Sequence, residues 1–239
     1  AGENNFNRLH YHTDPNILER AYAAYFESPG IAALNNLFKR GSFSSVQDRE
    51  AVLLLFSLFA ARNPRDRICL EDNVEYLNNV LVCSALGPEV LCSSEDLSVL
   101  KMNSSKHACV ELNLIGDIHQ CLLDRKWRFL QSSDDSPGFV TSDYPVTMIP
   151  HPSRPTDDWG LGFALKDVSV FIPLSRKYAL LGDYGVEERN VMLDRNAVAA
   201  FNSHIIRNAT RQVYAYSDQF EFFGPDNILL AGKELPNVI

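Results

Sequence analysis

Three arginines, Arg62, Arg65 and Arg67, follow directly on a strongly apolar stretch of the chain. Guanidinium groups bind carboxylates and phosphates through paired hydrogen bonds, so this cluster could hold an anionic ligand. The alternative is structural, because cations at the C-terminal end of a helix compensate its macrodipole and could pair with Glu19 or Glu27 inside a helical bundle. Both interpretations place the arginines at the end of a helix.

A second polar pair, Ser142-Asp143, stands at the end of a predicted strand, in a turn that Pro145 restricts. A carboxylate held there is well placed to act as a general base or a metal ligand. The alternative is a local turn in which both side chains satisfy their own backbone. A serine nucleophile is not expected, since the chain has no Gly-x-Ser-x-Gly motif. We assign catalytic roles to Asp143 and Glu19, and ligand-binding roles to Arg62, Arg67, Ser142 and Trp127.

A third group of polar residues lies on a predicted helix. His107 and Glu111 are four residues apart and share a face, and Asp117 and His119 follow. Metal binding would require ligands from another element, so we predict a surface pair with a partly buried His119 and no metal site. Phosphate-binding glycine motifs are absent from the sequence, and the requirement for a cofactor stays open.

Several segments in order resemble one family of microbial and fungal proteins, known as domain of unknown function 4238. They are 59–67, 127–130, 139–146 (Phe-Val-Thr-Ser-Asp-Tyr-Pro-Val) and 172–175 (Ile-Pro-Leu-Ser), supported by Glu19, Glu27 and the helix containing Asn202 that leads to 211–214. The resemblance covers about residues 9 to 217 and implies no activity, because the family has none established. Members usually begin with a His- and Pro-containing stretch, which we expect this chain to lack.

Apolar residues at helical spacing fill the first half of the chain. We predict helices over 14–26, 31–39, 46–62, 71–86 and 105–125, and a short one near 95–101. Asp14 and Pro15 are typical of a helix start, and Ser28-Pro29-Gly30 predicts a break. Ser44 with Gln47 forms a capping box, and Ser45 with Asp48 is a weaker alternative.

The period of the apolar residues changes from about 3.6 to 2 after Lys126. We predict strands over 127–131, 139–141, 146–149, 168–173, 178–182, 213–216 and 228–230, with the first two forming a hairpin, and a late helix over 194–210. The predicted fold class is α+β, in which a helical half packs on an antiparallel, hairpin-rich sheet. The predicted subdomains are 1–126 and 127–239, which together form one compact unit.

Composition limits the classes of partner. The 239 residues carry a net charge of −8, so no overall cationic field attracts nucleic acid or an anionic membrane. The longest apolar run, 51–61, is too short to span a bilayer, and no signal peptide is visible. Five cysteines without a Cys-x-x-Cys pair favour a reduced chain without disulfides. We therefore expect a cytoplasmic protein without a membrane partner.

Two hypotheses about function follow. The first is an enzyme acting on an anionic substrate, a phosphoester or a nucleic acid, at the seam between the helical and sheet halves. Asp143 would serve there as the base or as a metal ligand, with Arg62 and Arg67 holding the anion. The alternative is a non-catalytic module that binds a ligand or partner, in which the same residues and Glu19 form a structural ion-pair network. Oligomeric state and substrate stay open.

Overall fold

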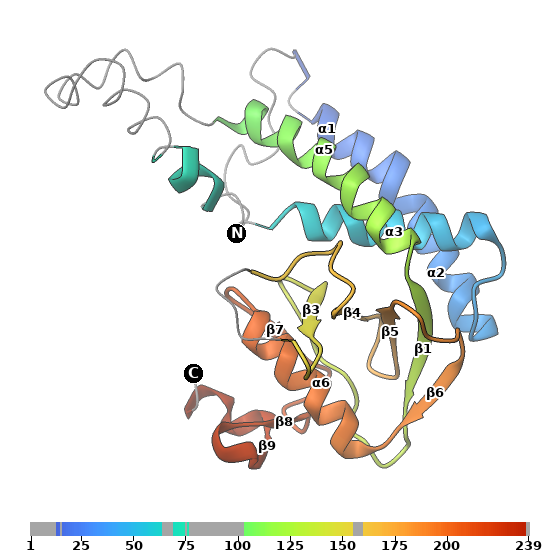
Figure 1. Cartoon of the computed structure of the whole chain (residues 1–239), viewed down its shortest axis with the longest axis vertical. Coiled ribbons are helices and arrows are strands. Elements are labelled where there is room, and N and C mark those ends of the chain that lie inside the picture. Colours follow the sequence, from blue (N-terminus) through green and yellow to red (C-terminus); the bar gives the residue numbers. More distant parts are fainter. Residues whose placement is uncertain are drawn as a thin grey trace, which may run out of the picture.

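The computed structural model describes residues 13–14, 16–63, 69–74, 76, 103–154 and 160–237. Helices occupy the first half and a sheet with one late helix the second, so the predicted α+β class is confirmed (Figure 1). The helices are α1 Ile17–Tyr22, a π-helical turn Ala23–Glu27, α2 Ser28–Arg40, α3 Val46–Ala61, α5 Ser104–Leu123 and α6 Arg195–Asn208. Residues 69–74 are also helical, whereas most of the predicted helix 71–86 and all of 95–101 lie outside the described residues.

The predicted break at Ser28-Pro29-Gly30 is wrong, because α1 runs through the π-helical turn directly into α2. Pro29 has no N–H, and its ring would clash with the carbonyl of Tyr25 in an ordinary α-helix. The wider turn over Ala23–Glu27 accommodates this proline without ending the helix. A Cβ on Gly30 would lie 2.7 Å from the Cβ of Leu55, so glycine allows α2 and α3 to approach closely.

Helix ends follow local side-chain chemistry. Ser45, rather than the predicted Ser44, caps α3 and accepts a hydrogen bond from the Asp48 amide at 3.0 Å. The N-cap of α1 is Asn16 rather than Asp14, whose carboxylate accepts from the Asn16 amide instead. Gly41 ends α2 with a φ of 69°, a left-handed conformation that glycine adopts without strain.

Five strands form the main sheet, in the order β3-β4-β5-β1-β6. All neighbours are antiparallel except β1 and β6, which are parallel. The strands of this sheet are β1 Lys126–Ser132, β3 Thr147–Pro150, β4 Val168–Pro173, β5 Tyr178–Asp183 and β6 Asn190–Leu193. Two small ladders pair β2 Thr141–Ser142 with β7 Val213–Tyr214 and β8 Glu221–Phe223 with β9 Leu229–Ala231.

The predicted hairpin between 127–131 and 139–141 is wrong. The antiparallel neighbour of β1 is β5, and β2 pairs with β7. The backbone before β2 is already bound elsewhere, because the Phe139 amide donates to the Arg176 carbonyl and the Val140 amide to the Asn202 side chain. Both partners are distant in sequence, which is why local alternation did not reveal them.

Both faces of the sheet are covered, which gives three layers (Figure 1). Val170 and Ile172 of β4 pack in one core with residues of α1, α2, α3 and α5, and Phe171 between them packs with α6. This alternation follows from the two-residue period of a strand. The core on the helical side therefore includes residues of both predicted subdomains, among them Leu122 and Trp127.

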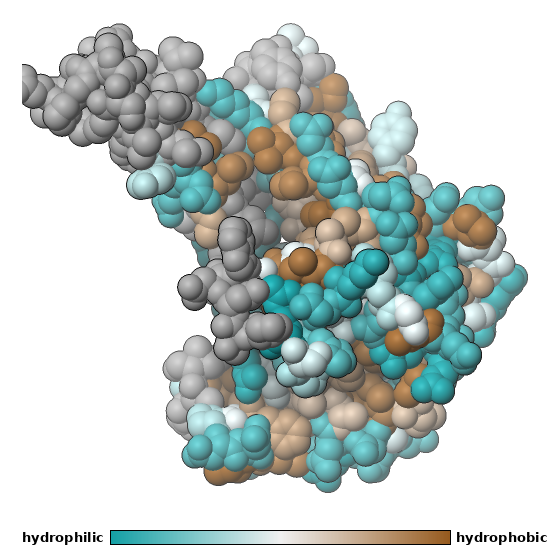
Figure 2. All heavy atoms as spheres, in the orientation of Figure 1, coloured by the Kyte–Doolittle hydropathy of each residue, from teal (hydrophilic) through white to brown (hydrophobic). Residues whose placement is uncertain are grey.

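The outer surface of the helical layer carries several exposed apolar side chains, including Tyr25, Ile31 and Leu112. In Figure 2 hydrophobic side chains gather over the upper helices, whereas much of the right-hand part of the molecule below them is hydrophilic. No helix within the described ranges is long and apolar enough to cross a membrane.

Candidate functional site

Asp143 joins two segments that are far apart in sequence. Its Oδ1 accepts a hydrogen bond from the Thr210 amide at 3.0 Å, and its Oδ2 accepts one from the Arg211 amide at 2.8 Å. The Asp143 amide in turn donates to the Gln212 carbonyl at 3.1 Å. The residue therefore clamps the turn after β2 to the segment that follows α6.

The neighbouring Ser142 is buried and bonds within its own turn. Its Oγ donates to the Tyr144 carbonyl at 2.9 Å and accepts from the Tyr144 amide at 3.1 Å. Such a hydroxyl shapes the backbone that carries Asp143.

The other residues singled out in the sequence lie in the helical layer or at its junction with the sheet. The guanidinium carbon of Arg62, at the end of α3, lies 4.5 Å from the centre of the Tyr22 ring. Glu19 is exposed in the first turn of α1. Trp127 is buried, and its Nε1 donates to the Leu122 carbonyl at 3.0 Å. Arg67 lies outside the described residues.

The contacts described for Asp143 and Arg62 lie in different parts of the fold, since Asp143 binds the amides of Thr210 and Arg211 and Arg62 lies over the Tyr22 ring. Trp127 does reach the seam, where it lines a cavity of about 340 Å³ with Phe43 and Asn190. The composite seam site thus stays a prediction.

Asp143 instead borders the wall of a different cavity, called here the α6 cavity. It has a volume of about 630 Å³. It is lined by Ser203, Ile206, Arg207, Ala209, Thr210, Arg211, Gln212, Val213, Phe222, Phe223, Gly224, Pro225 and Leu235. Two arginines and several apolar side chains line it, and the described lining contains no aspartate or glutamate. A cavity lined by both arginine and apolar side chains suits an anionic organic ligand.

Two side chains on α6 build this cavity by holding β8 against the helix. Asn202 donates to the carbonyls of Gly138 at 3.1 Å and Glu221 at 2.9 Å, and accepts from the Val140 amide at 3.0 Å. Ser203 accepts from the Phe223 amide at 2.7 Å. The part of the lining that β8 contributes is therefore held in place by buried polar side chains of α6.

His204, on α6 beside the cavity, does not add to its positive charge at neutral pH. Burial lowers the pKa of His204, and the adjacent Arg207 lowers it further, so this imidazole is neutral at pH 7. The positive charge of the cavity near neutral pH therefore comes from its arginines and not from His204.

A second, smaller cavity of about 300 Å³, called here the aromatic cavity, lies at the other end of β7. It is lined by Phe139, Val140, Thr141, Pro173, Leu174, Ser175, Arg176, Tyr214, Ala215 and Tyr216. The guanidinium carbon of Arg176 lies 4.9 Å from the centre of the Tyr216 ring, and its Nε donates to the Pro137 carbonyl. Segments singled out in the sequence, 139–146, 172–175 and 211–214, therefore meet here.

The predicted surface pair on α5 is wrong, because His107 and Glu111 are both buried. Glu71, from the helical residues 69–74, places its Oε1 2.8 Å from the His107 Nε2 and covers this face. Within the ranges described above, no group of three or more His, Cys, Asp or Glu residues could hold a metal ion.

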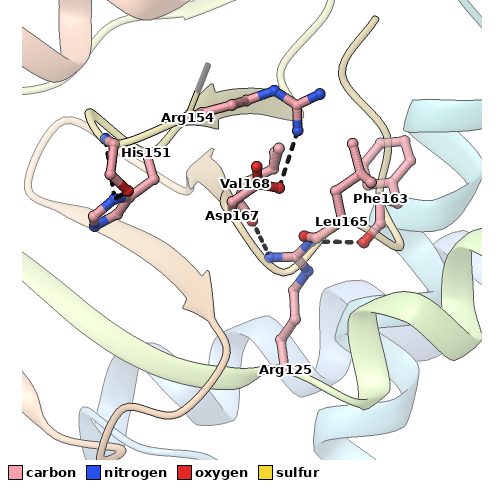
Figure 3. A network of polar contacts seen from close by, with 8 residues as sticks. Arg125, His151, Arg154, Phe163, Leu165, Asp167 and Val168 are labelled. Atoms are coloured by element: carbon pink, nitrogen blue, oxygen red, sulfur yellow. Dashed lines mark hydrogen bonds and ion pairs between the residues drawn. The ribbon is translucent and has the colours of Figure 1, made fainter. Parts of the chain in front are cut away.

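Sequence reasoning also missed Arg125, a fully buried arginine at the junction of α5 and β1. Its Nη1 donates to the carbonyls of Val168 at 2.6 Å and Gly182 at 3.1 Å. Its Nη2 donates to the carbonyls of Phe163 at 2.6 Å and Leu165 at 3.3 Å (Figure 3). In the same view Arg154 pairs with Asp167 just before β4. Arg125 thus anchors a connecting loop to the sheet and belongs to the scaffold.

A comparison with protein families matches residues 1–219 to the one described as "Protein of unknown function (DUF4238)". The chain belongs to the DUF4238 family. The match begins before the first segment that carried the resemblance and ends just after β7, so it includes most of the lining of both cavities. No curated protein and no solved structure matches this DUF4238 protein.

Substitutions at Arg62 and Asp143 should affect stability differently. We expect Arg62→Ala to cost about 1–2 kcal/mol, because it removes both the contact with the Tyr22 ring and a half-buried stem. Asp143→Asn should cost about 1 kcal/mol, since one of two amide donors would face an NH₂ group at an exposed site. Urea unfolding measures both values. Losses above 3 kcal/mol for both variants would instead indicate a buried structural ion-pair network.

Proposed function

We propose that this DUF4238 protein binds an anionic organic molecule in the α6 cavity. The observation that carries the proposal is the charge of the lining, to which the side chains of Arg207 and Arg211 contribute. The Asp143 carboxylate beside this wall is already bound by the amides of Thr210 and Arg211. The chain as a whole has 30 acidic and 22 basic residues, so the charged residues of this lining have the opposite sign to the net charge of the protein. Phosphate and carboxylate groups are the natural partners of paired guanidinium groups.

The rest of the cavity favours a ligand with an apolar body. Ile206, Phe222 and Leu235 contribute apolar surface beside the arginines. A cavity of about 630 Å³ falls within the range of small-molecule sites. An aromatic or branched molecule with a phosphate or carboxylate at one end matches both the arginines and the apolar side chains of the lining.

Binding is favoured over catalysis by the lining itself. Of the described residues around the cavity, none is Asp, Glu, His or Cys, the usual general bases. The Ser203 hydroxyl already donates to the Ala199 carbonyl at 2.8 Å. Asp143 contacts the wall through the amides of Thr210 and Arg211 and so positions it. The hydrolase hypothesis therefore ranks second, and the test below also measures it.

The probe is 1-naphthyl phosphate, compared with uncharged 1-naphthol by isothermal titration calorimetry. We expect the phosphate to bind at least tenfold more tightly, because only it can use the arginines. Release of fluorescent 1-naphthol in the same samples would report hydrolysis and favour the enzyme hypothesis. Equal affinity for the two probes would contradict anion recognition.

Arg207→Gln provides the site-specific test, with Arg40→Gln as a matched control. Both are exposed arginines in the last turn of a helix, so both substitutions remove the same interaction with a helix dipole. We expect Arg207→Gln to weaken binding of 1-naphthyl phosphate about tenfold and Arg40→Gln to leave it unchanged. Equal losses in the two variants would place the anion elsewhere.

The three described cysteines, Cys69, Cys109 and Cys121, are free thiols, whereas Cys83 and Cys92 lie outside the described residues. We propose on this basis that the protein works in a reducing compartment such as the cytoplasm.

A further inference from the structure

The lining of the α6 cavity comes from two separate parts of the chain. Arg207 and Arg211 belong to α6 and the segment after it, within the part that matches the family. The aromatic side chains of the described lining, Phe222 and Phe223, belong to β8, which lies beyond residue 219, where that match ends. In Figure 1 the hairpin of β8 and β9 lies beside α6. This hairpin therefore adds aromatic surface to a lining that contains two arginines.

The two phenylalanines of β8 differ in what they contact, because successive side chains of a strand point to opposite faces. Phe222 is 2% exposed and packs in the core that includes residues of α6, with 6.2 Å between its ring centre and that of Phe220. Phe223 is half-buried, lines the cavity and belongs to neither core of the described residues. Of the two, Phe223 is therefore the one whose ring is left for a ligand.

The backbone that carries Phe223 is fixed before any ligand binds. Its amide donates to the Ser203 hydroxyl of α6 at 2.7 Å, and two residues earlier the Glu221 carbonyl accepts from the Asn202 side chain at 2.9 Å. On its other side Phe223 pairs with Leu229 of β9. A ring held on a strand in this way loses little freedom on binding, which favours both affinity and selectivity.

We propose that Phe223 makes the α6 cavity selective for anions that carry an aromatic ring, namely aryl phosphates or aryl carboxylates. The inference rests on the proposed function, because Arg207 and Arg211 hold the anionic group of the same ligand. Phe223 contacts the ring of that ligand and determines which apolar body is accepted.

Two kinds of contact favour an aromatic body over an aliphatic one of the same size. Aromatic rings attract each other in offset or edge-to-face arrangements beyond the gain from burying apolar surface. Guanidinium groups also stack on aromatic faces, so Arg207 and Arg211 can add to the selection. An aliphatic ring gains only from the burial of its surface.

The test compares three phosphates by isothermal titration calorimetry. Phenyl phosphate and cyclohexyl phosphate have the same charge and the same number of carbon atoms, and methyl phosphate has the anion without a ring. We expect phenyl phosphate to bind about threefold more tightly than cyclohexyl phosphate, although cyclohexyl has the larger apolar surface. Methyl phosphate should bind at least tenfold more weakly than phenyl phosphate.

Phe223→Leu assigns the selection to one side chain, because it keeps an apolar residue and removes the ring. We expect this variant to lose the preference for phenyl over cyclohexyl phosphate and to bind methyl phosphate as before. Phe223→Ala should weaken phenyl phosphate about tenfold, again without affecting methyl phosphate. The unchanged affinity for methyl phosphate shows in both cases that the arginines are still in place.

Leu229→Ala is the matched control. Leu229 lies directly opposite Phe223 in the hairpin, so both side chains are on the same face, but Leu229 does not belong to the described lining. Its removal loosens the same cross-strand pair and should change none of the three affinities. Equal losses of phenyl phosphate in Leu229→Ala and Phe223→Ala would assign the effect to the hairpin as a whole and overturn the inference.

The outcomes separate this inference from the function on which it rests. If phenyl and cyclohexyl phosphate bind equally well, or if Phe223→Leu keeps the full preference, the inference is overturned while anion binding by the cavity stands. If neither these phosphates nor 1-naphthyl phosphate bind, both proposals are overturned together.

Discussion

Replacing Arg125 with methionine should destabilise the protein by about 3–5 kcal/mol. The side chain is fully buried and donates to four backbone carbonyls, two of them on β4 and β5 and two in the loop before β4. Methionine matches the apolar stem but leaves those acceptors without their donor. Methionine also avoids the cost of burying a charged group, but this gain offsets only part of the loss, because each buried carbonyl without a donor costs about 1–3 kcal/mol.

Arg125→Lys separates charge from geometry. Lysine keeps the positive charge but presents a single nitrogen, which cannot span carbonyls that now bind two different nitrogens of the guanidinium group. We expect a loss of about 2–3 kcal/mol by urea unfolding, monitored through Trp127. Exposed Arg189→Met serves as the control and should change stability by less than about 0.5 kcal/mol. A loss below 1 kcal/mol for Arg125→Met would show that the carbonyls find other partners.

The elements that local chemistry determines could be predicted from the sequence. The change of apolar period after Lys126 placed the helix-to-sheet boundary between α5 and β1, where the structure has it. Asp194, the first residue of the predicted helix 194–210, caps α6 and accepts from the Ala197 amide at 2.8 Å. In each case the signal lies within about one turn or one strand of the chain.

Features that depend on distant partners could not be predicted in this way. β6 has alternate exposed residues and lies at an edge, parallel to β1, so it showed no continuous apolar run. The π-helical turn before α2 relieves a clash at Pro29 that a sequence rule treats as a break. In the sequence, Arg125 is a cation at the end of the predicted helix 105–125. Its burial depends on the loop before β4, whose carbonyls accept from its guanidinium group.

The same distinction applies to the candidate site. Asp143 was a candidate because of its position in a turn after a predicted strand. Its hydrogen-bond donors are the amides of Thr210 and Arg211, which are 67 and 68 residues away in sequence. Arg207 and Arg211 flank the end of the predicted helix 194–210, but the sequence analysis did not identify them as a site. Nothing local indicated that β8 would close a cavity beside them.

Asn202→Leu should cost about 3–4 kcal/mol, although leucine has nearly the same shape. Asn202 is completely buried and makes three hydrogen bonds, to Val140, Gly138 and Glu221. Leucine would leave one amide and two carbonyls buried without partners. Asn208→Leu, on the same helix, is the matched control, because Asn208 is only half-buried and makes one side-chain bond at 3.3 Å to Thr147. It should cost about 1 kcal/mol or less.

Asn202→Asp adds a dependence on pH whose sign follows from the same contacts. The new carboxylate could accept from the Val140 amide, but it would face the carbonyls of Gly138 and Glu221. Burial and these carbonyls would raise its pKa in the folded state above the unfolded value, because they disfavour the charged form. The variant should therefore be least stable at neutral pH and recover, relative to the original protein, as the pH falls through the raised pKa.

Urea unfolding at several pH values measures this recovery, and binding of 1-naphthyl phosphate connects it with the site. Asn202 holds β8 against α6, and Phe222 and Phe223 of β8 line the α6 cavity. Asn202→Leu should therefore weaken the probe even where the variant is fully folded, whereas Asn208→Leu should not. If Asn202→Leu binds the probe normally, the cavity does not depend on that contact, and the anion is held by the end of α6 and the segment after it.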